Sequence, residues 1–186
     1  MHILEYVGWL GTGLYLLNHA YISYAKNLKK WVYYLGNLIA ASILTVTSLI
    51  EHSWQAVVIN GFWALISLLL ILSAPIQKIA FPMSAFHRLI FLFWPTTLVG
   101  FYLDFQLGFM ILGWSSAFAF CASYLLFNAN IMKPIEYSIW NTYAAIVLLP
   151  QLWIDMNYPV FGLELAWAVI SLYGVKKRYQ HGHLID

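Results

Sequence analysis

Seven long apolar stretches, separated by short polar or charged segments, run along the 186-residue chain. The stretches are Ile3–Tyr24, Trp31–Ile50, Ser53–Ser73, Arg88–Phe105, Gly108–Phe127, Tyr137–Ile154 and Tyr158–Val175. Each comes close to the roughly 20 residues that an α-helix needs to cross a hydrocarbon core about 30 Å thick. The pattern predicts an all-α integral membrane protein of seven transmembrane helices.

The charged residues divide unevenly between the two sides of the membrane that these helices would define. Alternation of the loops places every basic residue on one side, namely Lys26, Lys29, Lys30, Lys78, Arg88, Lys133, Lys176, Lys177 and Arg178. The other side holds the acidic residues Glu5, Glu51, Asp104 and Asp155, with no Lys or Arg. Because basic loops remain in the cytoplasm, we expect the N-terminus outside and the C-terminus in the cytoplasm.

Composition excludes several other classes of protein. Hydrophobic residues make up 62% of the chain and charged residues 9%, whereas a soluble domain carries about 25% charged residues. The net charge of +2 is too small to suggest a nucleic-acid partner. The single cysteine, Cys121, excludes a disulfide within the chain.

The sequence repeats itself at an offset of 104 residues. Residues 33–68 align without a gap to residues 137–172, with 11 identities in 36 positions. The most informative identities are the pair Asn37 and Asn141, and the Trp-Ala-x-Ile-Ser-Leu segments that begin at Trp63 and Trp167. With gaps of one residue, the match extends back to Gly8-Trp9 and Gly113-Trp114, so each copy contains three of the predicted helices.

Three crossings reverse the direction of the chain, so a second copy in the same orientation needs one additional crossing. Arg88–Phe105 supplies it and has no counterpart in the repeat. We therefore expect a first three-helix repeat over residues 1–74, a linker with the fourth transmembrane helix over 75–107, and a second three-helix repeat with a basic cytoplasmic tail over 108–186. Parallel repeats of this kind are related by a pseudo-two-fold axis along the membrane normal.

The first half carries Gly8-Trp9, Tyr33–Leu38 and Val57–Ile66, and on these segments it resembles an uncharacterised bacterial three-helix membrane domain. The second half resembles it by repetition, and the likeness implies a bacterial inner membrane. In architecture the whole chain resembles the SWEET and PQ-loop families and the PnuC-type vitamin transporters. The SWEET resemblance implies a substrate-facing asparagine near aromatic residues in the third helix of a unit, which Asn60 and Trp63 match. The second unit departs from this pattern, because Glu164 stands where an asparagine is expected.

Glu164 is the seventh residue of the last predicted helix, roughly 10 Å from its outer end at 1.5 Å per residue. An ionisable side chain at that depth is costly and usually faces a cavity or a partner. Its repeat mate is Asn60, and each is followed one turn later by a tryptophan on the same face, Trp167 or Trp63. Facing one another across the pseudo-axis, these four side chains would suit a flat, polar or cationic solute. The alternative is structural, with a protonated or hydrogen-bonded Glu164 and tryptophans that only pack.

Asn37 and Asn141 lie one or two turns inside the cytoplasmic ends of their predicted helices, where they would line the inner half of a transport path. Paired asparagines also hold transmembrane helices together through interhelical hydrogen bonds. The nearby Gly36, Ala40 and Ala41 favour this second role, since small residues mark close helix packing.

A small-molecule transporter or facilitator with its site between the two repeats is the function that these features favour. The site residues expected for the substrate are Asn60, Trp63, Glu164, Trp167, Asn37 and Asn141. A structural or regulatory membrane subunit is the alternative, and the sequence favours a membrane-embedded enzyme or a seven-helix receptor less, because it has neither a catalytic motif nor an interior lysine in the last helix. We expect no cofactor and no metal, and as partners the lipid bilayer, an unidentified small molecule and, in a homo-oligomer, further copies of the chain.

Overall fold

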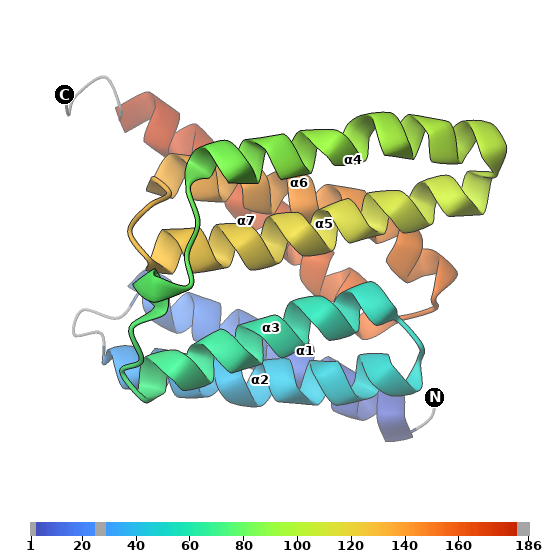
Figure 1. The fold of residues 1–186 in the computed structure, drawn as a ribbon. Coiled ribbons are helices and arrows are strands. Elements are labelled where there is room, and N and C mark those ends of the chain that lie inside the picture. The colour runs from blue at the N-terminus through green and yellow to red at the C-terminus, as the bar shows by residue number, and fades with distance from the viewer. Residues whose placement is uncertain (1–2, 25–28, 182–186) are drawn as a thin grey trace. The chain divides into compact units, whose positions relative to one another are not determined.

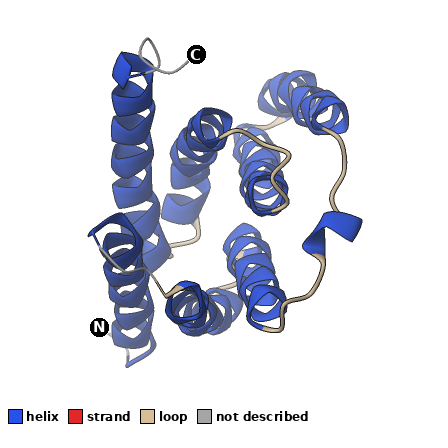
Figure 2. Cartoon of the chain, turned by 90° about the vertical axis from the view of Figure 1, so that its left-hand side faces the viewer, coloured by secondary structure: helices blue, strands red, loops and turns tan. Residues whose placement is uncertain are grey.

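The structure is a computed structural model, and it describes residues 3–24 and 29–181, with side chains described for 3–18 and 29–176. Seven α-helices and one short 3-10 helix make up these residues, and Figure 2 shows no strand among them. The helices are α1 (Ile3–Tyr24), α2 (Lys30–Ile50), α3 (Trp54–Ile71), α4 (Met83–Leu103), α5 (Phe105–Asn128), α6 (Pro134–Ile154) and α7 (Tyr158–His181), with the 3-10 helix η1 (Ile76–Lys78) between α3 and α4. The seven helices predicted from the apolar pattern are all present (Figure 1).

Five of the helices are long and apolar enough to cross a membrane. They are α2, α3, α4, α5 and the part of α7 from Tyr158 to Lys176. The side chains of α1 are described only as far as Asn18, and α6 carries the polar residues Glu136, Asn141 and Gln151. Neither α1 nor α6 is among the five.

Both predicted boundaries of α4 are wrong. The helix expected to begin at Arg88 begins at Met83, directly after Pro82 in extended conformation. Asp104 is also extended, with φ −159°, and its Oδ1 accepts a hydrogen bond from the backbone N–H of Leu107 at 2.8 Å. Asp104 is therefore the N-cap of α5, and Phe105 begins that helix instead of ending the preceding one.

The turns α2–α3 and α6–α7 have the same hydrogen-bond pattern at the 104-residue offset. The backbone N–H of His52 donates to Leu49 O (3.2 Å), and that of Met156 donates to Trp153 O (3.2 Å). Each next residue donates to a carbonyl five positions back, which is the Schellman arrangement of a helix end. His52 and Met156 both have positive φ, 56° and 55°, as do Ser73 after α3 and Asn130 after α5, so this is a common way for helices of this chain to end.

The chain forms two compact units, which are described separately. The first contains residues Met1–Lys78 and Leu152–Leu163, and the second contains Ile79–Gln151 and Glu164–Asp186. The first unit thus includes the α6–α7 turn and the beginning of α7. The division into residues 1–74, 75–107 and 108–186 stays a prediction.

In the first unit, small residues of α1 allow close approach to its neighbours. A Cβ atom added at Gly8 would lie 2.8 Å from the ring of Pro159, and one at Gly11 would lie 2.9 Å from Ile43. The hydroxyl of Thr12 donates to the Pro159 carbonyl oxygen at 2.7 Å. The bond gives the buried Thr12 hydroxyl of α1 an acceptor at the beginning of α7.

The two repeated turns are also hydrogen bonded to each other within the first unit. The Asn157 side-chain amide donates to Ser48 Oγ at 2.9 Å, and the Ser53 hydroxyl donates to Asp155 Oδ2 at 2.6 Å. Asn157, Ser48 and Ser53 are fully buried. A buried polar group needs a partner to offset its loss of hydration, so these two bonds couple the turns.

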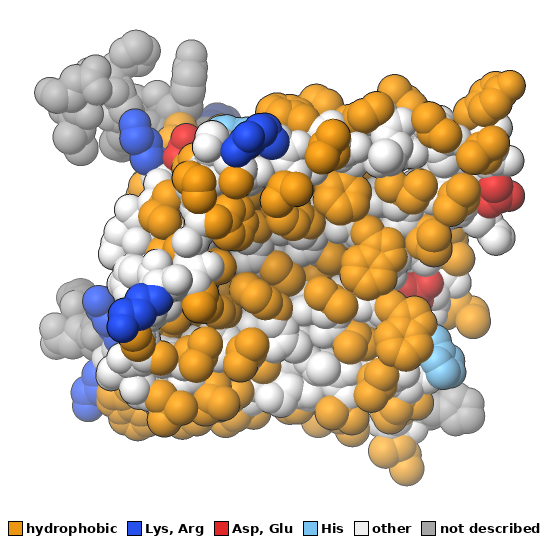
Figure 3. Space-filling view, viewed as in Figure 1, with side chains coloured by type: hydrophobic (Ala, Val, Ile, Leu, Met, Phe, Trp, Pro, Cys, Tyr) orange, Lys and Arg blue, Asp and Glu red, His pale blue; other side chains and the backbone are white. Residues whose placement is uncertain are grey.

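In the second unit, α4 and α5 form an antiparallel hairpin (Figure 1). Their backbones approach closely at two glycines, since a Cβ atom at Gly100 would lie 3.1 Å from the Gly108 Cα. Figure 3 shows hydrophobic side chains along this hairpin, with basic side chains at one end and an acidic side chain at the other. In the sequence, Arg88 lies near the beginning of α4 and Asp104 directly follows its end.

Candidate functional site

Glu164 lies in α7 with 5% of its surface exposed. Its Oε2 atom is buried and has no hydrogen-bond partner among the described residues. A buried charged group that lacks a partner is costly, because nothing replaces the hydration that it loses. The sequence singled out this residue by its depth, and the structure adds that an oxygen of its carboxyl is left unsatisfied.

Trp167 lies one turn after Glu164, and its indole is held in place by α6. The indole Nε1–H donates to Asn141 Oδ1 at 3.1 Å. The Asn141 amide in turn donates to the Tyr137 carbonyl oxygen at 2.8 Å and approaches Ser123 Oγ at 3.5 Å. Because both ends of the Asn141 amide are engaged, the acceptor for the indole has a fixed orientation.

Asn60 and Trp63, the repeat mates of Glu164 and Trp167, are both buried in α3. The Asn60 amide donates to the Ala56 carbonyl oxygen one turn earlier, at 2.9 Å. The Trp63 ring meets the Tyr15 ring of α1 edge to face, with centroids 5.9 Å apart. Asn60 is therefore hydrogen bonded within its own helix, while Trp63 contacts the first helix of its repeat.

Asn37 connects α2 to α1. The Asn18 side-chain amide donates to Asn37 Oδ1 (2.8 Å) and to the Tyr33 carbonyl oxygen (2.9 Å). Asn18 lies directly over Gly36, where an added Cβ atom would collide with the Asn18 amide. This geometry is that of a helix–helix contact, which is the second of the two roles considered for Asn37.

The paired asparagines of the two repeats differ in their partners. Asn141 Oδ1 accepts from the third helix of its repeat, through Trp167, whereas Asn37 Oδ1 accepts from the first helix, through Asn18. Asn18 and Ser123 occupy matching positions, since the first helices align at an offset of 105 residues. In the first repeat the Asn18 amide donates to the Tyr33 carbonyl oxygen. The shorter Ser123 side chain does not reach the equivalent Tyr137 carbonyl oxygen, which accepts from the Asn141 amide instead.

The six candidate residues divide between the two compact units. Asn37, Asn60 and Trp63 belong to the first unit, and Asn141, Glu164 and Trp167 belong to the second. The predicted meeting of the two sets stays a prediction. Among the residues that the structure describes, no group of three or more His, Cys, Asp or Glu side chains is arranged to hold a metal ion.

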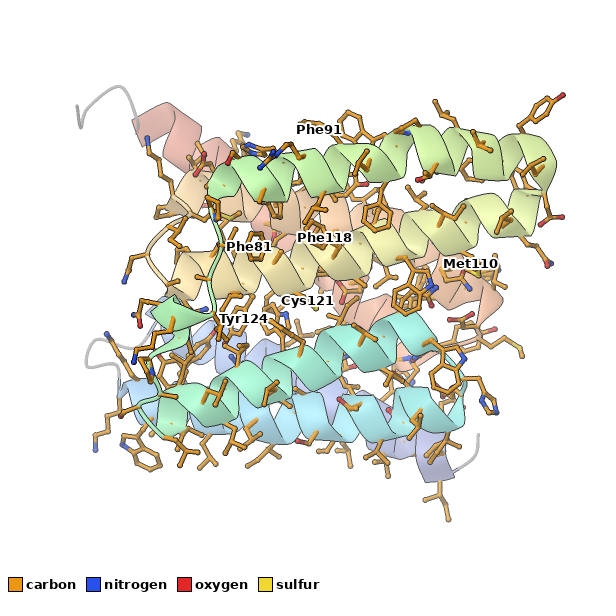
Figure 4. The ribbon with its side chains drawn as sticks, in the orientation of Figure 1. Phe81, Phe91, Met110, Phe118, Cys121 and Tyr124 are labelled. Carbon is orange, nitrogen blue, oxygen red and sulfur yellow. The ribbon has the colours of Figure 1, made fainter. Side chains whose placement is uncertain are left out.

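An aromatic cluster in the second unit was not predicted from the sequence. Trp140 of α6 contacts the Phe86 ring edge to face at 4.9 Å, and Phe86 stacks on Phe118 at 5.7 Å. Figure 4 labels Phe118 on α5 and Phe91 on α4, and Phe91 also contacts Trp140 at 6.5 Å. Aromatic residues are so frequent in this chain that spacing alone does not reveal which of them meet.

The model of one protein family, whose members are uncharacterised, matches the chain twice, over residues 4–78 and 109–182. The chain belongs to this family. No curated protein and no solved structure matches it.

The two family segments agree with the duplication predicted from the sequence, since they begin and end at nearly the same offset as the 104-residue repeat. Asn37, Asn60 and Trp63 lie in the first family segment, and Asn141, Glu164 and Trp167 lie in the second. The α4 helix (Met83–Leu103) lies between the segments, as expected for a linker without a counterpart in the repeat.

The two family segments each contribute an acidic residue to the same end of the first unit. Glu51 follows α2 and Asp155 follows α6, and Glu5 lies in the first turn of α1. Burial raises the pKa of Glu51 above its ordinary value, and the nearby negative charges of Glu5 and Asp155 raise it further. The folded state therefore holds a proton on Glu51 at pH values where the unfolded chain has released it.

We expect this carboxyl to make stability fall as pH rises. The folded state binds more protons than the unfolded state between the unfolded pKa of about 4.3 and the raised folded pKa, so the free energy of unfolding decreases across that window. Thermal unfolding of the purified protein in detergent at a series of pH values from 4 upward measures the effect. Glu51→Gln should flatten the profile in this window, and an unchanged slope in the variant would contradict the assignment to Glu51.

Proposed function

We propose that this protein is a seven-helix transporter or facilitator of a small molecule, with two parallel three-helix repeats joined by α4. Five helices apolar enough to cross a membrane and a twofold family match support the membrane location and the duplication. The proposed orientation has the N-terminus outside and the C-terminus in the cytoplasm of a bacterial inner membrane. This orientation rests on the placement of every Lys and Arg on one side of the predicted helices. Of these residues, Lys26 and the side chains of Lys177 and Arg178 lie outside the described residues.

The observation that carries this proposal is the buried Glu164 carboxyl with its unsatisfied oxygen. A purely structural glutamate in an apolar helix is expected to have its oxygens bonded to neighbouring side chains or carbonyls. An oxygen without a partner within the described residues leaves a hydrogen-bonding position that a solute fills in this proposal. Trp167, on the same helical face one turn later, offers a large flat surface beside it.

The first repeat contributes the second half of the proposed site. Asn60 and Trp63 occupy the repeat positions of Glu164 and Trp167, and all four side chains are buried. In this proposal Glu164 and Trp167 contact the solute directly, Asn60 and Trp63 contribute the equivalent surface, and Asn37 and Asn141 position helices and side chains around them.

Replacing Glu164 with glutamine tests the proposal, because it retains size and removes the charge. A thermal-shift screen of sugars, vitamins, nucleosides and amines against the purified protein identifies a stabilising solute. We expect Glu164→Gln to weaken binding of that solute by about a hundredfold, the scale of losing one charge-assisted contact in a buried site.

The matched control is Glu136→Gln, which removes a carboxyl from the first turn of α6, where Glu136 accepts a hydrogen bond from the Lys133 backbone. Solute binding should be unchanged in this variant. A folded Glu164→Gln protein that binds every solute as wild type does, or one that elutes only as unfolded aggregate, would show that Glu164 has a structural role. Co-purification of a stoichiometric partner protein would favour a subunit instead.

A further inference from the structure

The charge of the solute follows from what surrounds Glu164, an inference that rests on the proposed function. No Lys, Arg or His in the described part of the chain forms an ion pair with this carboxyl. The basic side chains described, such as Lys30, Lys78 and Lys133, lie at helix ends. We propose that the solute that binds at Glu164 is an organic cation, with its positive charge on the Glu164 carboxylate and a flat or alkylated group on the Trp167 ring.

The Glu164 carboxylate needs a countercharge. A carboxylate in an apolar helix without a countercharge is strongly destabilised. A cationic solute supplies the missing charge, whereas a neutral solute leaves it uncompensated and an anion is repelled. Of the three charge classes, only a cation gains from the burial of the carboxylate.

The indole of Trp167 also favours a cation. Its only hydrogen-bond donor, Nε1–H, is already donated to Asn141 Oδ1. With this donor engaged, the indole cannot donate to a solute oxygen, and its ring face is the part that would meet the proposed solute. Ring faces carry partial negative charge and attract cations, and tryptophan does so more strongly than the other aromatic residues.

Acidic side chains gather at the turn that leads into α7. Asp155 precedes α7, and both Asp155 and Glu5 lie close enough to Glu51 in the same unit for their negative charges to act on it. The α2–α3 and α6–α7 turns, residues 51–53 and 155–157, contain neither Lys nor Arg. A region of negative potential raises the local concentration of cations and lowers that of anions.

Three ring compounds of similar size and different charge test the inference, namely 1-methylnicotinamide (cation), nicotinamide (neutral) and nicotinate (anion). Their affinities are measured by isothermal titration calorimetry on the full chain in lipid nanodiscs. We expect wild type to bind the cation more tightly than the neutral compound, and the anion least. Equal affinities, or tighter binding of the neutral compound or the anion, would overturn the inference.

Variants test whether Glu164 and Trp167 are responsible for the preference for a cation. We expect Glu164→Gln to weaken binding of 1-methylnicotinamide about a hundredfold and Trp167→Leu about tenfold, with Glu164→Asp in between. Glu136→Gln and Trp31→Leu are the controls, since Trp31 is 59% exposed, and both should bind as wild type does. A folded Glu164→Gln variant with unchanged cation affinity would overturn the inference.

The same measurements separate this inference from the proposed function. If a neutral solute from the thermal-shift screen binds in a Glu164-dependent manner and 1-methylnicotinamide does not, the transporter proposal stands and the cation inference fails. If no ring binds, the tetraalkylammonium series from methyl to butyl replaces the rings. The absence of Glu164-dependent binding across that series as well would overturn the inference.

Discussion

Replacing Gly36 with leucine is expected to lower the free energy of unfolding by about 4 kcal/mol, the sum of an overpacked contact and two lost buried hydrogen bonds. An added Cβ atom at Gly36 collides with the Asn18 amide. Moving that amide away breaks its bonds to Asn37 Oδ1 and to the Tyr33 carbonyl oxygen. The remaining groups are then left buried without partners, which costs more than the bonds contributed.

Gly13 provides a matched control on α1, because an added Cβ atom there has nothing within 4 Å. Gly13→Leu should leave stability unchanged or slightly raised, since leucine forms helices better than glycine. Reversible unfolding in mixed detergent micelles measures both variants. Asn18→Ala combined with Gly36→Leu should recover part of the loss, and a Gly36→Leu protein as stable as wild type would contradict the close α1–α2 contact.

Replacing Asn157 with leucine is expected to cost about 3 kcal/mol, from the loss of a helix cap and of a buried side-chain hydrogen bond. Asn157 is 0% exposed. Its Oδ1 accepts from the backbone N–H of Val160 at 3.3 Å at the beginning of α7, and its amide donates to Ser48 Oγ at 2.9 Å. Leucine leaves both the backbone donor and the Ser48 hydroxyl without a partner.

A double-mutant cycle with Ser48→Ala isolates the bond between the two turns. Asn157→Ser retains a capping oxygen but not the donor, so we expect it to lose roughly half as much stability as Asn157→Leu. The unfolding free energies of the two single variants should not add in the double variant, because both remove the same bond. Strict additivity would show that Asn157 acts only as a cap.

Helix positions were largely predictable because each helix coincides with a long run of apolar side chains. The bounds of α1 agree with the prediction, and those of α2 differ by one residue. The beginning of α4 was predicted five residues late, because Ser84 and His87 are polar and yet belong to the helix. Backbone hydrogen bonds continue through such residues, so hydropathy marks where a helix enters an apolar environment and not where it begins. The N-cap role of Asp104 follows a recognised signal and was predictable in principle.

The candidate site was predictable in its positions and not in its contacts. Helical spacing places Glu164 and Trp167 on one face, and the repeat identifies Asn37 and Asn141 as equivalent. That Trp167 gives its only donor to Asn141, 26 residues away, depends on how α6 and α7 are rotated against each other. Periodicity describes one helix at a time, so it specifies a face without specifying which neighbour that face meets.

The first compact unit is built from two separate parts of the chain. Three helices of the first repeat are completed by Leu152–Leu163, a turn that belongs to the second repeat. The hydrogen bonds from Asn157 to Ser48 and from Ser53 to Asp155 join these parts. The first family segment therefore depends on a turn of the second for partners to its buried Ser48 and Ser53 side chains, so its helix ends are completed only within the duplicated chain.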